Sequence, residues 1–360
     1  MSSDEIDIEV EDEIDDEIVS VNYDIASYPS DLTLAGLAQM WRDKDIQIPD
    51  YQREFVWTVK QSSLLIDSFL CNLPVPNVFF YVDEDNRNIV IDGQQRILSV
   101  VFFLEGYFGK ETASGKRQVF RLSGLNKKSP YYNKRFIDLT ESDQRKLKQS
   151  VLRAINIKQL NPIGESTSAY HIFERLNTGG TPLKPQEIRN CVFIGGLSKI
   201  LRDLNKDSNW RSIIGKKDVD KHQKDVELIL RVFSLVGNGW QSYEKPMSEF
   251  LNKAMKEHRS GETKRVETFF KAFPLAAKKV IDDLGDKPFR VRGPINVAAL
   301  ESVMCVLTYN YKKLASINLK KSYTSLLKSD EFDELTRVNT TDVKTVQERI
   351  RLVNKVLMGK

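Results

Sequence analysis

Apolar and polar positions in the first half of the chain predict a small amount of β-structure. Residues 78–82 form an apolar run and residues 88–91 form a second one, with the polar turn 83–86 between them. Two such runs around a turn are typical of a β-hairpin. Residues 154–160 alternate between apolar and polar side chains, which predicts one more strand.

Helical spacing occupies most of the remaining first half. Leu65 and Phe69 lie four residues apart, as an amphipathic helix requires. Thr140-Glu141-Ser142-Asp143 resembles a capping box, and Pro185 suits the first turn of a helix. Residues 106–135 are polar and look like an irregular insertion. We expect helices over residues 30–41, 60–71, 94–104, 140–152, 168–176 and 185–193.

The second half of the chain shows no strong strand pattern. Helical periodicity recurs there over residues 225–236, 247–258, 267–284, 296–314 and 343–358. The sequence therefore predicts an α+β domain over residues 26–195, followed by an all-helical C-terminal domain over residues 196–360.

Composition fits a globular protein of the cytoplasm. The 360 residues are 41% hydrophobic and 29% charged, which excludes collagen-like and wholly disordered chains. The longest apolar run, 97–104, is too short to span a bilayer, and we expect neither a membrane partner nor a signal peptide. Cys71, Cys191 and Cys305 lie too far apart for a zinc motif or a disulfide framework. A reducing compartment fits best.

Charge is distributed unevenly along the chain. Residues 1–24 contain 11 acidic and no basic residues, which leaves 39 acidic against 54 basic residues, a net charge of +15, in the rest. The basic body favours an anionic partner such as nucleotide or nucleic acid, although a solvated surface explains the surplus equally well. We expect residues 1–25 to be an acidic disordered tail. It either aids solubility or competes with a polyanion for the basic body.

The strongest local pattern for chemistry is Ile91–Arg96, between a predicted strand and a predicted helix. Backbone N–H groups and the helix dipole converge at such a start and favour anions. Gly93 allows a tight turn. Asp92 suits either a helix cap or a cation held against phosphate, and Arg96 offers a planar fork for phosphate oxygens. The alternative is a capped helix with a solvent-exposed arginine.

Two further patterns combine polar side chains with a break in secondary structure. Tyr51-Gln52-Arg53 follows the bend at Pro49 and precedes Phe55 and Trp57. Those aromatic rings could fix the segment while Arg53 reaches into a cleft; the alternative is a surface arginine beside a core strand. The predicted helix 168–176 ends in Asn177-Thr178-Gly179-Gly180, which supplies donors and flexible backbone or simply a helix C-cap.

The order of these motifs resembles one known family. Tyr51-Gln52-Arg53 with Trp57 is followed by Asp92-Gly93-Gln94-Gln95-Arg96, then by Phe173-Glu174-Arg175-Leu176-Asn177-Thr178-Gly179-Gly180, and then by Gln186-Glu187-Ile188-Arg189-Asn190. The chain resembles the N-terminal (S-type) domain of GmrSD-like modification-dependent restriction endonucleases. That domain is similar to the ParB/sulfiredoxin-like fold. Lys224-Asp225-Val226-Glu227 and Tyr243-Glu244-Lys245-Pro246-Met247 also resemble the family.

The resemblance implies a module of restriction or anti-phage systems that binds and hydrolyses a nucleoside triphosphate (NTP). By matching position, Gln52, Arg53, Asp92, Gln95 and Arg96 would line the nucleotide pocket, with Tyr51, Gly93 and Gln94 beside them. Asn177, Thr178, Gly179 and Gly180 would form its second wall. The catalytic candidates are Asp92, Arg96, Gln52 and Arg53. Asp92 would bind Mg²⁺ or orient water, and the two arginines would neutralise phosphates.

One departure from the family concerns nuclease activity. Two-domain relatives carry a His-Asn-His-type nuclease domain, whereas this chain has only His171, His222 and His258. We interpret His171 as structural and the other two as solvated, so cleavage would fall to a separate nuclease or defence subunit, or to nicking by the ParB-like pocket. The alternative function is a nucleotide-liganded module that binds or senses DNA and works with a separate effector. Lys216-Lys217, Lys221, Lys224 and Lys320-Lys321 could contact a nucleic-acid backbone. Whether the chain forms an oligomer stays open.

Overall fold

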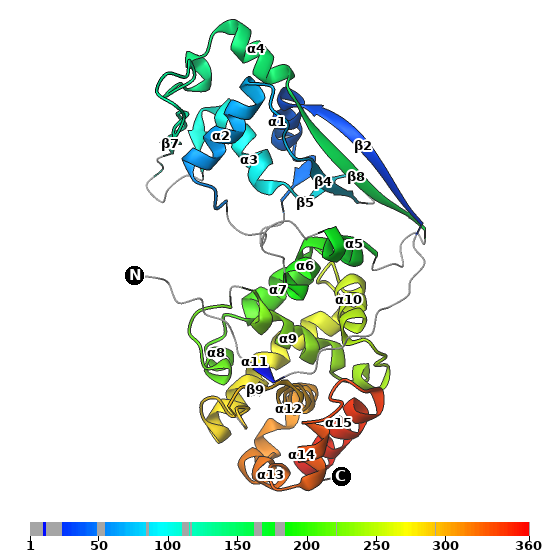
Figure 1. Cartoon of the computed structure of the whole chain (residues 1–360). Coiled ribbons are helices and arrows are strands. Elements are labelled where there is room, and N and C mark those ends of the chain that lie inside the picture. The colour runs from blue at the N-terminus through cyan, green and yellow to red at the C-terminus, as the bar shows by residue number, and fades with distance from the viewer. Residues whose placement is uncertain are drawn as a thin grey trace. The chain divides into compact units, whose positions relative to one another are not determined.

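The computed structural model describes residues 10–11, 24–48, 55–83, 86–109, 115, 117–161, 168–176, 184–220, 222–291 and 293–359. The chain divides into two compact units (Figure 1). One comprises Asn22–Pro182 and is called the sheet unit below. The other, the helical unit, comprises Leu183–Lys360 together with Met1–Val21. The division falls before residue 195, where the sequence boundary was placed.

A mixed five-stranded sheet organises the sheet unit. Its strand order is β2-β8-β4-β5-β3. The pairs β2–β8 and β4–β5 are antiparallel, whereas β4–β8 and β3–β5 are parallel. The strands are β2 (Asp24–Thr33), β3 (Ile46–Gln47), β4 (Val78–Val82), β5 (Asn88–Asp92) and β8 (Val151–Asn161). This confirms the predicted hairpin and the predicted strand 154–160.

Helices pack against this sheet to form the core of the unit. They are α1 (Leu34–Arg42), α2 (Val59–Leu70), α3 (Gln94–Glu105), α4 (Glu141–Gln149) and α5 (Ser168–Leu176). Thr58 opens α2 with a capping box, and the Thr140 hydroxyl caps α4 by accepting from Asp143 N–H. Apolar side chains of α1, α2 and α3 join strand residues such as Val78 and Val90 in one buried cluster. The predicted helices of this half are confirmed in place, but α4 ends at Gln149, so Val151 and Leu152, predicted to be helical, begin strand β8.

The long strand β2 was not predicted. The sequence favoured a helix from residue 30, but the strand continues to Thr33 and pairs with β8 along its whole length. Thr33 then caps α1, because its hydroxyl accepts from Gly36 N–H. Partnering with β8 outweighs the weak local helix signal. The predicted irregular insertion 106–135 also contains two short strands, β6 (Tyr107–Phe108) and β7 (Gln118–Val119), and a 3₁₀ turn over Phe136–Asp138 follows it.

The helical unit carries the remaining helices. They are α6 (Pro185–Val192), α7 (Gly196–Leu204), α8 (Ser208–Ile214), α9 (Lys224–Leu235), α10 (Met247–Glu257), α11 (Lys264–Leu284), α12 (Val297–Tyr309), α13 (Leu319–Leu326), α14 (Asp330–Leu335) and α15 (Val343–Met358). Two 3₁₀ segments, Gly239–Gln241 and Tyr311–Ser316, connect them. Nearly every residue of α12 is buried, so this helix forms the centre of the unit. The helices predicted for this half are confirmed, whereas α7, α8, α13 and α14 were not predicted.

The acidic N-terminal segment contributes one described element, β1 (Val10–Glu11). It pairs in parallel with β9 (Ile295–Asn296) of the helical unit. Val10 and Glu11 of the segment 1–25, predicted to be disordered, therefore form a strand pair, and Asp24 and Ile25 belong to β2. The other residues of that segment lie outside the described residues. Within the described parts of the chain, no helix is both long and apolar enough to cross a membrane.

Candidate functional site

A sharp turn between β5 and α3 forms the candidate site. Strand β5 ends at Asp92, and Gly93 has a left-handed backbone with φ of 100° at the N-cap of α3. A Cβ atom on Gly93 would lie 2.3 Å from Val78 Cγ1 of strand β4. Both the backbone angle and the close packing require glycine here. The structure thus supports the prediction that Gly93 makes the turn possible.

Asp92 and Arg96 form an ion pair across this turn. Arg96 Nη2 donates to Asp92 Oδ2 at 2.5 Å and to the carbonyl oxygen of Asn77 at 3.0 Å. The Arg96 side chain is 17% exposed and the Asp92 side chain 37%. Asp92 therefore does not cap α3, since the N-cap is Gly93, and the alternative of a solvent-exposed arginine is wrong. The fixed guanidinium keeps one buried donor, Nε, without a hydrogen-bond partner among the described residues.

Gln95 connects the turn to the end of the Tyr51–Trp57 motif. Its Oε1 accepts from the backbone N–H groups of Val56 and Trp57 at 3.0 and 3.1 Å. The Phe55 ring also packs edge-on against Phe102 of α3, with ring centroids 5.0 Å apart. These contacts hold the end of the Tyr51–Trp57 motif beside the turn. Sequence reasoning gave Gln95 a role toward nucleotide and missed this positioning role.

The predicted residues Tyr51, Gln52 and Arg53 lie outside the described residues, as do Asn177, Thr178, Gly179 and Gly180. The helix that precedes the second set is described. It is α5, which contacts β5, and its buried Phe173 lies against Tyr81 of β4 with ring centroids 6.3 Å apart. The described flanks of all three motifs therefore meet on strands β4 and β5 and on helix α3. Gln94, the first residue of α3, is half-buried at the same turn.

The turn offers one carboxylate to a cation. Among the described residues, no group of three or more His, Cys, Asp or Glu side chains could hold a metal ion. Mg²⁺ often binds through one or two carboxylates together with the phosphates of a nucleotide. Asp92 is exposed enough for that shared arrangement. Its ion pair with Arg96 uses the Oδ2 atom, so a cation could approach Oδ1. The donor set suits a nucleotide-bound cation rather than a protein cage.

A different family motif lies in the interior of the helical unit. Gln186, Glu187, Arg189 and Asn190 of α6 are all at most 2% exposed. Arg189 donates to Glu227 at 2.8 Å, to Asn252 at 3.0 Å and to Gln186 at 3.1 Å. Burial opposes ionisation of Glu227, but Arg189 and Arg231 outweigh it and hold the pKa of that carboxyl below its usual range. The motif therefore connects α6 with α9 and α10 and is part of the scaffold.

The same interior network extends further than the sequence indicated. Glu301 of α12 accepts from Arg349 of α15 at 2.6 Å, and Arg211 of α8 pairs with the fully buried Asp225 at 2.6 Å. The buried Asp225 and the partly buried Glu227 belong to the motif that resembled the family, so the charges of this motif pair helices within the unit. No spacing pattern in the sequence indicates which of these charged residues are buried.

His222 and His258, both predicted to be solvated, are placed differently from expectation. His258, predicted to be solvated, is 7% exposed and its Nδ1 lies 2.9 Å from Thr263 Oγ1. It was misread because lysines surround it in sequence, whereas helix packing buries it. His222 is partly buried, with Nδ1 3.3 Å from Glu187, and His171 lies 3.5 Å from Glu174 on α5.

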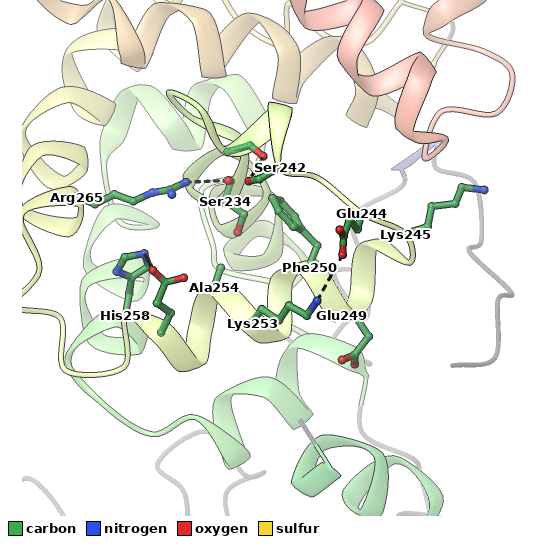
Figure 2. A pocket seen from close by; sticks show the side chains of 12 residues that line it. Ser234, Ser242, Glu244, Lys245, Glu249, Phe250, Lys253, Ala254, His258 and Arg265 are labelled. Carbon is green, nitrogen blue, oxygen red and sulfur yellow. Dashed lines mark hydrogen bonds and ion pairs between the residues drawn. The ribbon is translucent and has the colours of Figure 1, made fainter. Parts of the chain in front are cut away.

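His258 and Arg265 line a cavity of about 180 Å³ in the helical unit (Figure 2). Arg265 donates to the carbonyl oxygens of Phe233 and Ser234 at 2.8 Å, and Figure 2 shows it turned toward Ser234. Those carbonyls lie in the last turn of α9, where a cation is stabilising. Arg265 therefore caps α9, and burial keeps the pKa of His258 below its ordinary value. This cavity is best explained as a structural feature of helix packing.

Comparison with known proteins bears on the sheet unit. Residues 36–194 match the family model of the GmrSD restriction endonuclease N-terminal domain, which includes the Asp92–Arg96 turn and extends through α6. Neither a search of curated proteins nor a search of solved structures found a match. The family match coincides with the motifs that converge on β4, β5 and α3. Residues 36–194 of this chain therefore resemble the N-terminal domain of the GmrSD restriction endonucleases.

Proposed function

We propose that the sheet unit is a ParB/sulfiredoxin-like module that binds and hydrolyses an NTP within a prokaryotic restriction or anti-phage system. The observation that carries this proposal is the turn at Asp92–Arg96, where a glycine-dependent backbone bend, an ion pair and a helix start coincide. Gln95 brings the end of a second motif to the same place. DNA would be the substrate or regulator of the system.

The turn can act on phosphates with the groups it already presents. Arg96 also donates to the Asn77 carbonyl, which would keep its guanidinium at the turn after its contact with Asp92 is released. The N–H groups at the start of α3 add positive potential. A bound Mg²⁺ would neutralise charge on the phosphates. Asp92 would then exchange its contact with Arg96 for the cation, which frees Arg96 for the nucleotide. Arg53 remains the second arginine of this proposal.

The test is phosphate release from ATP, GTP, CTP and UTP with Mg²⁺, with and without DNA. We expect Arg96→Ala to lower turnover by roughly 10²- to 10³-fold, the usual cost of one preorganised donor to a developing charge. Arg87→Ala is a matched control, because Arg87 also pairs with an aspartate four residues away, Asp83, at 3.0 Å on the far end of β5. Wild-type turnover in Arg96→Ala, or equal losses in both variants, would overturn the assignment.

A second candidate function is a nucleotide-liganded DNA-binding or DNA-sensing module that works with a separate effector. The charge of +15 on residues 25–360 favours it. The two functions differ in turnover. Nucleotide binding without phosphate release for any of the four nucleotides, together with salt-dependent DNA binding that survives Asp92→Ala and Arg96→Ala, would select the sensor.

A further inference from the structure

A basic hollow lies on the helical unit, within the part of the chain that the structure describes. It measures about 480 Å³ and surrounds the end of α8 and the loop after α11. Five of its lining side chains are cationic and one is acidic. The lining residues are Lys206, Ser208, Arg211, Ser212, Gly215, Lys216, Lys217, Asp286 and Lys287. Lys216-Lys217 was already a candidate backbone contact in the sequence, whereas Lys206 and Lys287 were not.

The backbone holds Lys287 at this hollow. Its own φ is 55°, a left-handed conformation that is uncommon for lysine. Its N–H donates to the carbonyl oxygen of Ser212 at 3.2 Å. Gly215 makes room for the side chain, because a Cβ there would lie 2.5 Å from Lys287 Cε. The exposed Lys287 ammonium is thus carried on a stem that packs directly against the end of α8.

The positive charge of the hollow comes from its lysines. Arg211 is neutralised within the fold, since it donates to Asp225 at 2.6 Å and to Asn205 at 2.9 Å. Lys206 pairs with Asp203, but both side chains are highly exposed, so the pair is weak. Lys217 and Lys287 are exposed, and no described acidic side chain lies within ion-pair distance of either. Their charge is therefore available to an anion.

We propose that this hollow binds the phosphate backbone of duplex DNA. Lysines supply point charges for phosphates, and Ser208 and Ser212 add hydroxyl groups of the kind that contact phosphate and sugar. The lining residues include no aromatic ring on which an unpaired base or a nucleobase could stack. The site therefore suits a continuous backbone better than a free nucleotide or a single strand. It extends the proposed function by naming a DNA-contacting surface that uses none of the residues of the Asp92–Arg96 turn.

The test measures DNA binding by fluorescence anisotropy over a range of NaCl concentrations. A labelled duplex is titrated with the full chain and with Lys217→Gln/Lys287→Gln. The matched control is Lys312→Gln/Lys313→Gln, an exposed lysine pair on the 3₁₀ segment Tyr311–Ser316 that lies outside the hollow. We expect the hollow variant to weaken binding about tenfold or more and to lower the slope of log K against log salt by about two. The control should change the affinity by less than about threefold.

Equal losses in the two variants, or a salt slope that the hollow variant does not change, would overturn the proposal. So would tighter binding of a single strand than of a duplex, or ATP binding that the hollow variant abolishes. Thermal melting of each variant verifies folding, and a charge-reversed pair, Lys217→Glu/Lys287→Glu, provides a second, larger perturbation. The hollow variant should keep wild-type phosphate release without DNA, so failure here and failure at the Asp92–Arg96 turn are distinguishable.

Discussion

Arg96 and Arg189 both belong to motifs that resemble the same family, yet their surroundings differ. Arg96 lies at an open turn, 17% exposed, with one carboxylate, one carbonyl and a buried Nε that has no hydrogen-bond partner in the described structure. Arg189 is 2% exposed and donates to Glu227, Asn252 and Gln186. Arg96 therefore keeps donor groups that a ligand could use, whereas the donor groups of Arg189 are hydrogen-bonded within the helical unit.

This difference shows that membership of a motif does not decide what a residue does. A second pair, Asp83 and Arg87, has the same spacing as Asp92 and Arg96 and lies at the opposite end of β5. There, Asp83 also accepts from the backbone N–H of Arg87 at 2.8 Å and closes the hairpin turn. The context of a glycine turn and a helix start, rather than the Asp–Arg pair itself, marks the candidate site.

The largest expected effect is a loss of stability when Arg189, whose side chain is part of the buried scaffold, is replaced. Arg189→Ala would remove a buried guanidinium and leave the partly buried Glu227, 17% exposed, without its nearest cation. Removing one partner of a buried pair typically costs about 3–5 kcal/mol, and the partial exposure of Glu227 places the expected loss at the lower end. We expect the helical unit to unfold at markedly lower temperature in calorimetry. Arg153→Ala is the control, because Arg153 and Asp31 form an exposed pair whose loss should lower the unfolding temperature far less. Similar losses in the two variants would contradict the scaffold role.

Gly93→Ala tests the turn itself. The substitution combines a left-handed backbone with a Cβ placed 2.3 Å from Val78 Cγ1, so we expect a loss of about 2–4 kcal/mol in the sheet unit. Gly109→Ala separates the two causes, because Gly109 has a φ of 74° and open space around its Cβ position. Chemical denaturation should show a clearly smaller loss for Gly109→Ala. Equal losses would mean that packing on Val78 contributes nothing.

The sequence predicts local features of the candidate site well. The strand ending at Asp92, the glycine turn and the helix from Gln94 all follow from short-range patterns. The capping box at Thr58, by contrast, and the strand β2 were not predicted. Strand β2 depends on its partner β8, more than a hundred residues away, and no local propensity reveals such pairing.

Burial of charge was the least predictable property. The sequence shows Arg189, Glu227 and Glu301 as ordinary charged residues on helices, and only packing of several helices places them in one interior network. His258 was misjudged for the same reason. The bonds from Gln95 to Val56 and Trp57 also depend on tertiary structure, so the sequence could suggest that the two motifs share a site but not how they are joined.

Gln95→Ala tests whether the Gln95 side chain holds Val56 and Trp57 beside the turn. It removes the acceptor for two backbone N–H groups, and we expect a local loss of about 1–2 kcal/mol near Val56 and Trp57. Hydrogen exchange of those two amides should accelerate, while the amides of α9 in the helical unit keep their rates. Gln95→Glu keeps an acceptor oxygen and should restore slow exchange. Fast exchange in both variants would show that the amide oxygen does not hold this segment.

The smallest expected effect is a pH dependence in the helical unit. Burial lowers the pKa of His258, an effect opposed by Glu257 and reinforced by Arg265, while Phe233 and Thr263 pack against the ring. Below pH 6.5 the unfolded chain therefore binds a proton that the folded chain does not, so stability is full above that pH and falls as pH decreases toward the lower folded pKa.

The stability of the helical unit should therefore decrease between pH 7 and pH 5.5. His258→Gln should flatten that part of the stability profile measured by urea denaturation, whereas the control His171→Gln, on the sheet unit, should leave the profile of the helical unit unchanged. An unaltered slope in His258→Gln would assign the pH dependence to another group. Loss of that slope in His258→Gln would instead show that the buried, neutral imidazole stabilises the helical unit, as Arg189 does.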